Sequence, residues 1–323
     1  MGLIENLKSY SEEIQISDDK KDLLDSFLSN GFPTTKDEEW KYTSLKKVIA
    51  NEYNIENKGQ VVDDSVIEKY SLGFENQIIF SDGKLINIPT IKGVSISGFS
   101  EFESNTNNSI LNLNKSLSQN GFTISIDKNT VVESPIEILF ISTTETNFSQ
   151  YRNLISIAEN AEVKFVERIQ NLNNSSSFVN NFTRINCDKN TKIEYNKIQN
   201  NTSESQLIDT VNVYQEQDST CDINTLIFGG SFTRNNLNFE QNGFNCESNM
   251  NGVSVLDNNQ LADNHTFVDH KSANCRSNEM YKGIYLDNSK GVFNGKIMVR
   301  PDAQKIDAFQ SNNNLLLSEN SSI

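Results

Sequence analysis

The sequence predicts a mainly β protein, in which a parallel β-helix of stacked coils follows a small N-terminal α-helical domain. Short runs of alternating apolar and polar residues begin near residue 77. Units of strand, polar turn and strand then recur, and their turn centres lie 28 or 29 residues apart. These centres are Asn160, Lys189, Asp218, Cys246, Asn274 and Asp302. An apolar spacing of two at such a period is typical of a β-solenoid, whose units bury their apolar faces only against their neighbours. A β-sandwich is the alternative, but it has no reason to keep so regular a step.

The first predicted domain, residues 1–76, has helical signals. Ser17 can cap a helix whose first turn carries Asp18 and Asp19, where negative charge suits the helix dipole. Asn30 and Gly31 end this helix.

A second helix is expected in the segment that follows. Thr35 and Glu38 have the spacing of a capping box. Apolar side chains then recur on one helical face, at Tyr42, Leu45 and Ile49. Trp40 is the only tryptophan of the chain, and we expect it to anchor this helical unit.

The second predicted domain, residues 77–323, is the β-helix core, interrupted by one helical stretch at 110–122. A solenoid leaves backbone groups unpaired at both ends of its stack, so both ends need a cover. The helical domain suits the first end, whereas the apolar run Leu315–Leu317 lies at the other. We therefore expect that a partner covers this edge or that the natural protein is longer.

Composition excludes several classes of protein. The net charge is −15 and no block of Lys or Arg occurs, which argues against binding to nucleic acid or to an anionic membrane. No apolar run approaches the ~20 residues that span a bilayer, and the N-terminus lacks the pattern of a signal peptide. The four cysteines form no CxxC pair, which favours free thiols in the cytoplasm.

Asparagine is unusually common, at about one residue in seven. Asn tolerates left-handed backbone and suits tight turns, so a turn-rich solenoid would use it. Nucleotide bias in the genome is the alternative explanation, and the sequence leaves both open.

His265, His270 and Cys275 are candidate metal ligands, because imidazole and thiolate groups recur here within a few residues. On a strand, however, His265 and His270 point to opposite faces, so they converge only across a bulge. Polar side chains stacked on the surface of successive coils are the alternative interpretation.

Three cysteines predict a thiol ladder. Cys187, Cys246 and Cys275 each follow an asparagine at similar points of their repeats, whereas Cys221 is out of register. Stacking would place Cys246 and Cys275 roughly 5 Å apart. This spacing suggests thiol or soft-metal chemistry, and a preference for a small residue at the turn is the alternative.

No catalytic motif stands out, so no catalytic residue is assigned and a non-enzymatic protein is expected. Gly229 and Gly230 lack the surroundings of a phosphate-binding loop, and no G-x-S-x-G sequence occurs. The alternative function is that of a β-solenoid enzyme, a lyase or hydrolase, acting on polysaccharides. Glu162 and Glu167 would be its candidate acid pair.

Three segments carry a resemblance to a known family. The sequences DEEWKYTSLKKV at 37–48, PIEILFIS at 135–142 and the long block at 256–318 are similar to the SufB/SufD family of iron–sulfur cluster assembly proteins. The first segment resembles the SufD branch rather than the SufB branch. The resemblance implies a right-handed parallel β-helix and a cytoplasmic complex with SufB, joined through the β-helix, and with the SufC ATPase.

In this family the complex receives persulfide sulfur and assembles a nascent cluster. The resemblance implies a scaffold subunit that supports iron acquisition, with an Fe–S cluster and reduced flavin in the complex and no cofactor held tightly by this chain alone; its binding residues are unknown. Family members continue through a Cys-Ser-His-Gly motif and helices that dock SufC. That motif does not occur before Ile323, and neither histidine follows Cys-Ser, so we expect a truncated chain.

Overall fold

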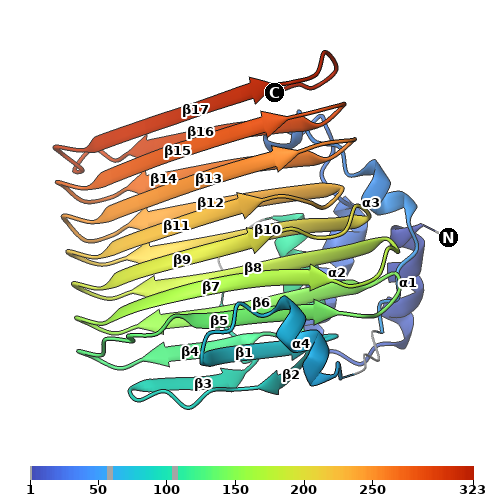
Figure 1. Ribbon diagram of the computed structural model, residues 1–323, viewed down its shortest axis with the longest axis horizontal. Coiled ribbons are helices and arrows are strands. Elements are labelled where there is room, and N and C mark those ends of the chain that lie inside the picture. The colour runs from blue at the N-terminus through green and yellow to red at the C-terminus, as the bar shows by residue number, and fades with distance from the viewer. Residues whose placement is uncertain (1, 57–60, 104–107) are drawn as a thin grey trace.

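The computed structural model describes residues 2–56, 61–103 and 108–323 of the chain. Strands alternate between two sheets and stack into a parallel β-solenoid, as predicted (Figure 1). The 9-stranded sheet has the order β17-β15-β13-β11-β9-β7-β5-β1-β2, and the 8-stranded sheet has the order β16-β14-β12-β10-β8-β6-β4-β3. Pairing is antiparallel only for β1 with β2 and β3 with β4 among the strands of the described ranges.

The strands of the 9-stranded sheet are β1 (Asn76–Ser81), β2 (Lys84–Asn87), β5 (Ile136–Ser142), β7 (Glu162–Asn171), β9 (Lys192–Gln199), β11 (Thr220–Ile227), β13 (Glu247–Leu256), β15 (Arg276–Tyr285) and β17 (Asp307–Leu316). Those of the 8-stranded sheet are β3 (Val94–Gly98), β4 (Phe122–Ile126), β6 (Phe148–Ile157), β8 (Ser177–Cys187), β10 (Ser205–Gln215), β12 (Phe232–Gln241), β14 (Leu261–His270) and β16 (Lys290–Val299). The helices are α1 (Leu3–Glu13), α2 (Asp18–Asn30), the short 3-10 helix η1 (Glu38–Trp40), α3 (Lys46–Ala50), α4 (Asp64–Tyr70) and α5 (Ser109–Leu117).

The turn between the two sheets repeats with nearly the same backbone in each coil. Three predicted turn centres, Asn160, Asp218 and Asn274, have φ near +60°. In two other coils the neighbouring asparagine takes this conformation, Asn190 at 54° and Asn245 at 58°. Because Asn tolerates left-handed backbone better than most residues, these turns account for part of the asparagine content.

Asparagines also stack between coils on the outer surface. Asn251 donates to Asn224, and Asn224 donates to Asn196, each over 2.9 Å. A column of amides on successive coils satisfies its own donors and acceptors, so the asparagines have a second structural role.

The N-terminal helices bury their apolar faces together with the first residues of strands from the 8-stranded sheet. Leu24, Phe27 and Trp40 share one buried cluster with Phe148 and Phe178. The helical unit therefore covers the side of the solenoid at which β6, β8, β10 and β12 begin (Figure 1). The division into domains at residues 76 and 77 stays a prediction.

The helix α2 begins after Ser17 and ends before Gly31, as predicted. The single helix expected from Thr35 to Ile49 is wrong, because the chain forms η1, a turn and then α3. Thr43 interrupts it: its hydroxyl donates to Asp263 of β14, which holds this stretch of backbone against the solenoid.

None of the helices in the described ranges is both long and apolar enough to cross a membrane. At the other end of the stack β17 is the outermost strand, and Phe309, Leu315 and Leu317 are each more than 60% exposed.

Candidate functional site

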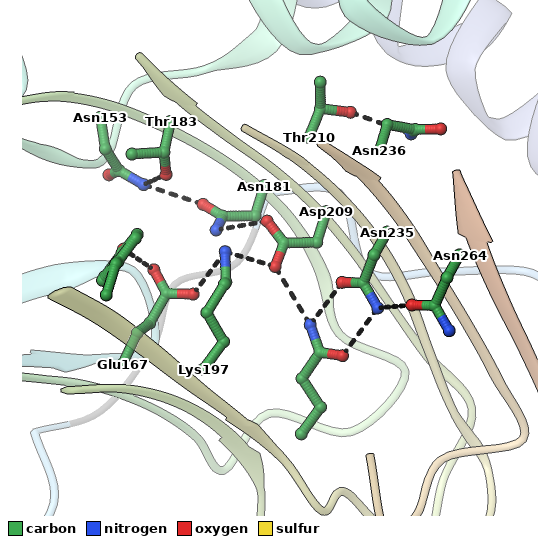
Figure 2. A network of polar contacts seen from close by, with 12 residues as sticks. Asn153, Glu167, Asn181, Thr183, Lys197, Asp209, Thr210, Asn235, Asn236 and Asn264 are labelled. Carbon is green, nitrogen blue, oxygen red and sulfur yellow. Dashed lines mark hydrogen bonds and ion pairs between the residues drawn. The ribbon is translucent and has the colours of Figure 1, made fainter. Parts of the chain in front are cut away.

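A buried ion triad lies inside the coils and joins the two sheets (Figure 2). The Lys197 ammonium lies 3.0 Å from Oε1 of Glu167 and 2.6 Å from Oδ2 of Asp209. Each of the three side chains is at most 2% exposed. Glu167 and Lys197 come from β7 and β9 of one sheet, whereas Asp209 comes from β10 of the other. The middle of the stack is therefore held by charge as well as by apolar packing.

Amide side chains extend this triad along the stack (Figure 2). Gln199 donates to Asp209 over 3.1 Å and exchanges two hydrogen bonds with Asn235, of 2.8 and 3.1 Å. Asn235 in turn donates to Asn264 over 3.1 Å. On the other side of the triad the network continues through Asn181, Asn153 and Thr183. The interior thus holds a polar network that crosses several coils.

The triad contains two carboxylates and one cation, and this imbalance governs its protonation. Burial raises the pKa of Asp209 to about 6; Lys197 opposes the rise and Glu167 adds to it. For Lys197, burial acts to lower the pKa, but Asp209 and Glu167 outweigh it and raise the pKa. Lys197 therefore stays an ammonium, and Asp209 takes up a proton as the pH falls toward 6.

Sequence reasoning missed this network, although a signal was present. Along β9 the buried side chains alternate, and Lys197 falls on the same side as Ile193 and Tyr195. A lysine at an inward position requires a buried anion nearby, which the alternation alone could have indicated.

The acid pair of the alternative enzyme is not brought together. Glu162 lies at the start of β7, where it forms a surface ion pair of 3.0 Å with Lys192. Glu167 lies on the opposite face of the same strand and points into the core. The spacing of five residues separates the two carboxylates, so they cannot flank one glycosidic bond.

Two cysteines of the predicted ladder, Cys246 and Cys275, lie on neighbouring coils. Glu247 pairs with Arg276, and the Arg276 N–H donates to the Cys246 carbonyl over 2.8 Å, so Cys275 follows Cys246 in the next coil. Cys221 pairs with Ser248, two positions further along, and is out of register as expected.

Cys187 does not belong to this column. It is the last residue of β8 in the other sheet and pairs with Gln215, whereas Cys246 and Cys275 follow the turn. The similar three-residue sequences hid this difference because they fall on different sides of the turn. Cys187 instead lies near Cys221, and all four cysteines are free and buried.

The three candidate metal ligands do not converge on one point. His270 is fully buried, and its Nε2 lies 3.1 Å from the Ser277 hydroxyl, close to Cys275. His265 points outward from the same strand, with Nε2 2.9 Å from Asp263 and Nδ1 3.3 Å from Glu39. Within the described ranges, no group of three or more His, Cys, Asp or Glu residues could hold a metal ion.

A cavity of about 540 Å³ lies on the outer face of the 8-stranded sheet, beside η1 and α5. At one end of it the N-terminal segment is fastened to the strands by a set of contacts that we call the clasp. Arg234 lies 3.9 Å from the ring centre of Trp40 and 2.7 Å from Asp263, which also accepts a 2.5 Å hydrogen bond from Thr43. His265 and Lys296 face Glu39 at the rim.

The clasp gives a structural role to part of the segment DEEWKYT. Trp40 lies in the apolar cluster of the helices, as expected, but it also stacks on Arg234 and so joins the helices to the solenoid. Burial acts to raise the pKa of Asp263, but the hydrogen bond from His265 and the charge of Arg234 outweigh it and lower the pKa. Asp263 thus stays ionised at the centre of the clasp.

Comparison with known proteins identifies the family of this chain. A family model described as the SUF system FeS cluster assembly, SufBD core domain, matches residues 140–323. The iron–sulfur cluster assembly protein SufD of Escherichia coli is 25% identical over 92% of this chain and 73% of its own length. An iron–sulfur cluster assembly SufBD family protein of Synechocystis is 22% identical over 94% of this chain and 73% of its own length. The family match extends over more than half of the chain and includes β7 to β17, and the chain therefore belongs to the SufB/SufD family of iron–sulfur cluster assembly proteins.

Proposed function

We propose that this chain is a non-catalytic scaffold subunit that assembles in the cytoplasm with SufB and the SufC ATPase. In that complex it supports iron acquisition and the formation of a nascent Fe–S cluster. Membership of the family and the similarity to a SufD protein support the proposal. The four free thiols suit a reducing compartment.

The outer edge of β17 is the observation that carries the partnership with SufB. Among the described residues β17 is the last strand of its sheet, and Phe309, Leu315 and Leu317 are 63%, 61% and 61% exposed. A strand with free backbone groups and exposed apolar side chains is a template for pairing with another chain. A second β-helix of the same family would continue the sheet and cover these side chains.

The nascent cluster would be cargo of the complex and not a resident group of this chain. The described residues offer no group of three or more His, Cys, Asp or Glu that could hold a metal ion. Reduced flavin would likewise be bound by the assembled complex. Iron and sulfide content after anaerobic reconstitution tests this point, with stable loading expected only when SufB and SufC are present.

The partnership is tested by co-expressing the tagged chain with SufB and SufC and measuring the molar mass of the purified complex by light scattering. Phe309→Lys places a charge on the exposed edge and should abolish co-purification of SufB. Phe228→Lys is the matched control, since Phe228 is also exposed, at 47%, but follows β11 in the middle of the stack. Loss of SufB from both variants, or from neither, would contradict an interface at β17.

A further inference from the structure

Cys246 and Cys275 lie one above the other at a corner of the solenoid, directly after the turn. Both sulfur atoms reach the same backbone oxygen, that of Gly243, at 3.2 and 3.4 Å. Neighbouring strands lie about 4.7–4.9 Å apart, which falls within the roughly 4.4–6.8 Å between Cα atoms that a disulfide spans. The spacing of the two residues is therefore compatible with a disulfide.

His270 stands beside this pair from the strand before the turn. It is fully buried, its Nε2 contacts Ser277, and its Nδ1 has no hydrogen-bond partner. A buried ring nitrogen without a partner carries an energetic cost, and a role in chemistry is one explanation for such a group. The imidazole is close enough to Cys275 to stabilise its thiolate.

The two thiols differ in acidity. The hydrogen bond from Cys246 and the nearby His270 lower the pKa of Cys275 to about 5, although burial opposes them. The bond to Cys275 and burial raise the pKa of Cys246. His270 lies beside Cys275, and its imidazole can accept the Cys275 proton, so Cys275 is assigned as the attacking sulfur and Cys246 as the thiol that resolves the oxidised sulfur.

We propose that Cys246 and Cys275 form a peroxide-sensitive dithiol that closes to a disulfide between neighbouring coils. The Cys275 thiolate attacks one oxygen of hydrogen peroxide, the O–O bond breaks, and hydroxide leaves a sulfenic acid on Cys275. The Cys246 sulfur then attacks the Cys275 sulfur, the S–O bond breaks, and the hydroxyl leaves as water with the Cys246 proton. The two sulfurs lose two electrons in total, and the peroxide gains them.

The position of the pair suits a small oxidant. Both thiols are at most 1% exposed, but Asn245 and Asn274, the residues before them in the turn, are exposed. Peroxide needs only a small opening of this turn, whereas a bulky thiol reagent needs a larger one. The site does not rest on the proposed scaffold function, and it can be tested on the chain alone.

The chain contains its own matched control. Cys187 and Cys221 are also buried and adjacent. Burial, followed by the contact with Cys221, raises the pKa of Cys187 well above its usual range. This second pair is therefore kept as thiols, and it should react far more slowly with the same oxidant.

The test treats the native chain with hydrogen peroxide, alkylates the remaining thiols in denaturant and digests with trypsin. Cleavage after Arg234, Lys271 and Arg276 places Cys246 in peptide 235–271 and Cys275 in peptide 272–276. These two peptides should appear linked, with the loss of two hydrogens. Cys187 in peptide 185–189 and Cys221 in peptide 198–234 should appear alkylated.

Two variants separate the roles of the partners. Cys246→Ser should leave Cys275 as a sulfenic acid that dimedone traps. His270→Gln should raise the pKa of Cys275 and slow the formation of the linked peptide. A rise from about 5 to about 6 lowers the thiolate fraction at pH 6 from about 0.9 to about 0.5, so the rate there should fall about twofold. An unchanged rate in His270→Gln, no linked peptide in the unmodified chain, or equal linkage of Cys187 to Cys221 would overturn the proposal. The comparison of the two pairs needs no variant, so it holds even if a variant fails to fold.

Discussion

Asp209 in the interior triad and Asp263 in the clasp are buried carboxylates of the same sheet, at 1% and 0% exposure. Their pKa values nevertheless move in opposite directions. The pKa of Asp209 is raised to about 6, whereas that of Asp263 is lowered. Asp209 shares one cation, Lys197, with a second carboxylate. Asp263 has Arg234 and His265 beside it and accepts a hydrogen bond from Thr43.

The difference shows that burial alone does not set the charge of these groups. The ratio of donors and cations to carboxylates decides whether a buried acid is a stable anion or a proton acceptor. The protonation of Asp209 in the interior triad therefore changes with pH, whereas Asp263 in the clasp stays ionised.

The largest effect is expected from Lys197→Met, which leaves Glu167 and Asp209 buried without their cation. Breaking a buried ion pair in this way costs about 4 kcal/mol of unfolding free energy at neutral pH. Urea denaturation measures it. Lys192→Met is the matched control, because Lys192 pairs with Glu162 at the surface and its side chain is 65% exposed. The control should change stability by less than about 0.5 kcal/mol, and an equal loss in both variants would contradict the triad.

Asp263→Asn should cost about 3 kcal/mol, because Arg234 stays buried without a carboxylate. The clasp should also open, so that trypsin cleaves after Lys41 in the variant before it cleaves the solenoid. Denaturation and the time course of proteolysis measure the two effects. Asp257→Asn at an exposed position is the control. Unchanged proteolysis in Asp263→Asn would mean that the apolar cluster alone fastens the segment.

The pH dependence of stability should carry the signature of Asp209. Its folded pKa of about 6 lies above the reference value of 3.8, so the folded state binds the proton more tightly. The stability from this proton is fully present below about pH 3.8 and is lost as the pH rises through about 6. In Asp209→Asn the slope across this window should flatten by about 2–3 kcal/mol in total. Asp263 contributes in the opposite sense, because its stabilisation is lost only as the pH falls through its lowered pKa. An unchanged slope in Asp209→Asn, measured by urea denaturation at several pH values, would contradict the raised pKa.

The smallest effect is expected from Glu39→Gln at the rim of the clasp. Glu39 and Lys296 pair over 3.1 Å, but their side chains are 53% and 57% exposed. Exposed ion pairs contribute about 0–1 kcal/mol, so the melting temperature should barely move. A loss comparable to that of Asp263→Asn would show that Glu39 belongs to the buried part of the clasp.

The fold could be predicted because its evidence is repeated along the chain. A turn that recurs every 28 or 29 residues, with Asn160, Asp218 and Asn274 at equivalent positions, needs no long-range information. The stacking of Cys246 on Cys275 followed from the same step. Cys187 was misplaced because the step gives the period but not the side of the turn.

The clasp could not be predicted because its partners are far apart in the sequence. Thr43 and Asp263 are 220 residues apart, and neither residue's neighbourhood indicates the other. The local pattern around Trp40 instead favoured a continuous helix, which the contacts with the solenoid override. The interior triad lies between these cases: the alternation along β9 could have indicated that Lys197 points inward, but only the fold supplied Asp209.

The stacking of coils also sets how this molecule would respond to mechanical force. Each coil contacts mainly the coil before it and the coil after it, so tension applied along the stack would peel the outermost coil first. One coil of about 28 residues releases roughly 90–100 Å of extended chain. A stretched molecule would therefore lengthen in equal increments, and the coils that Lys197 bridges would yield at a higher tension than their neighbours.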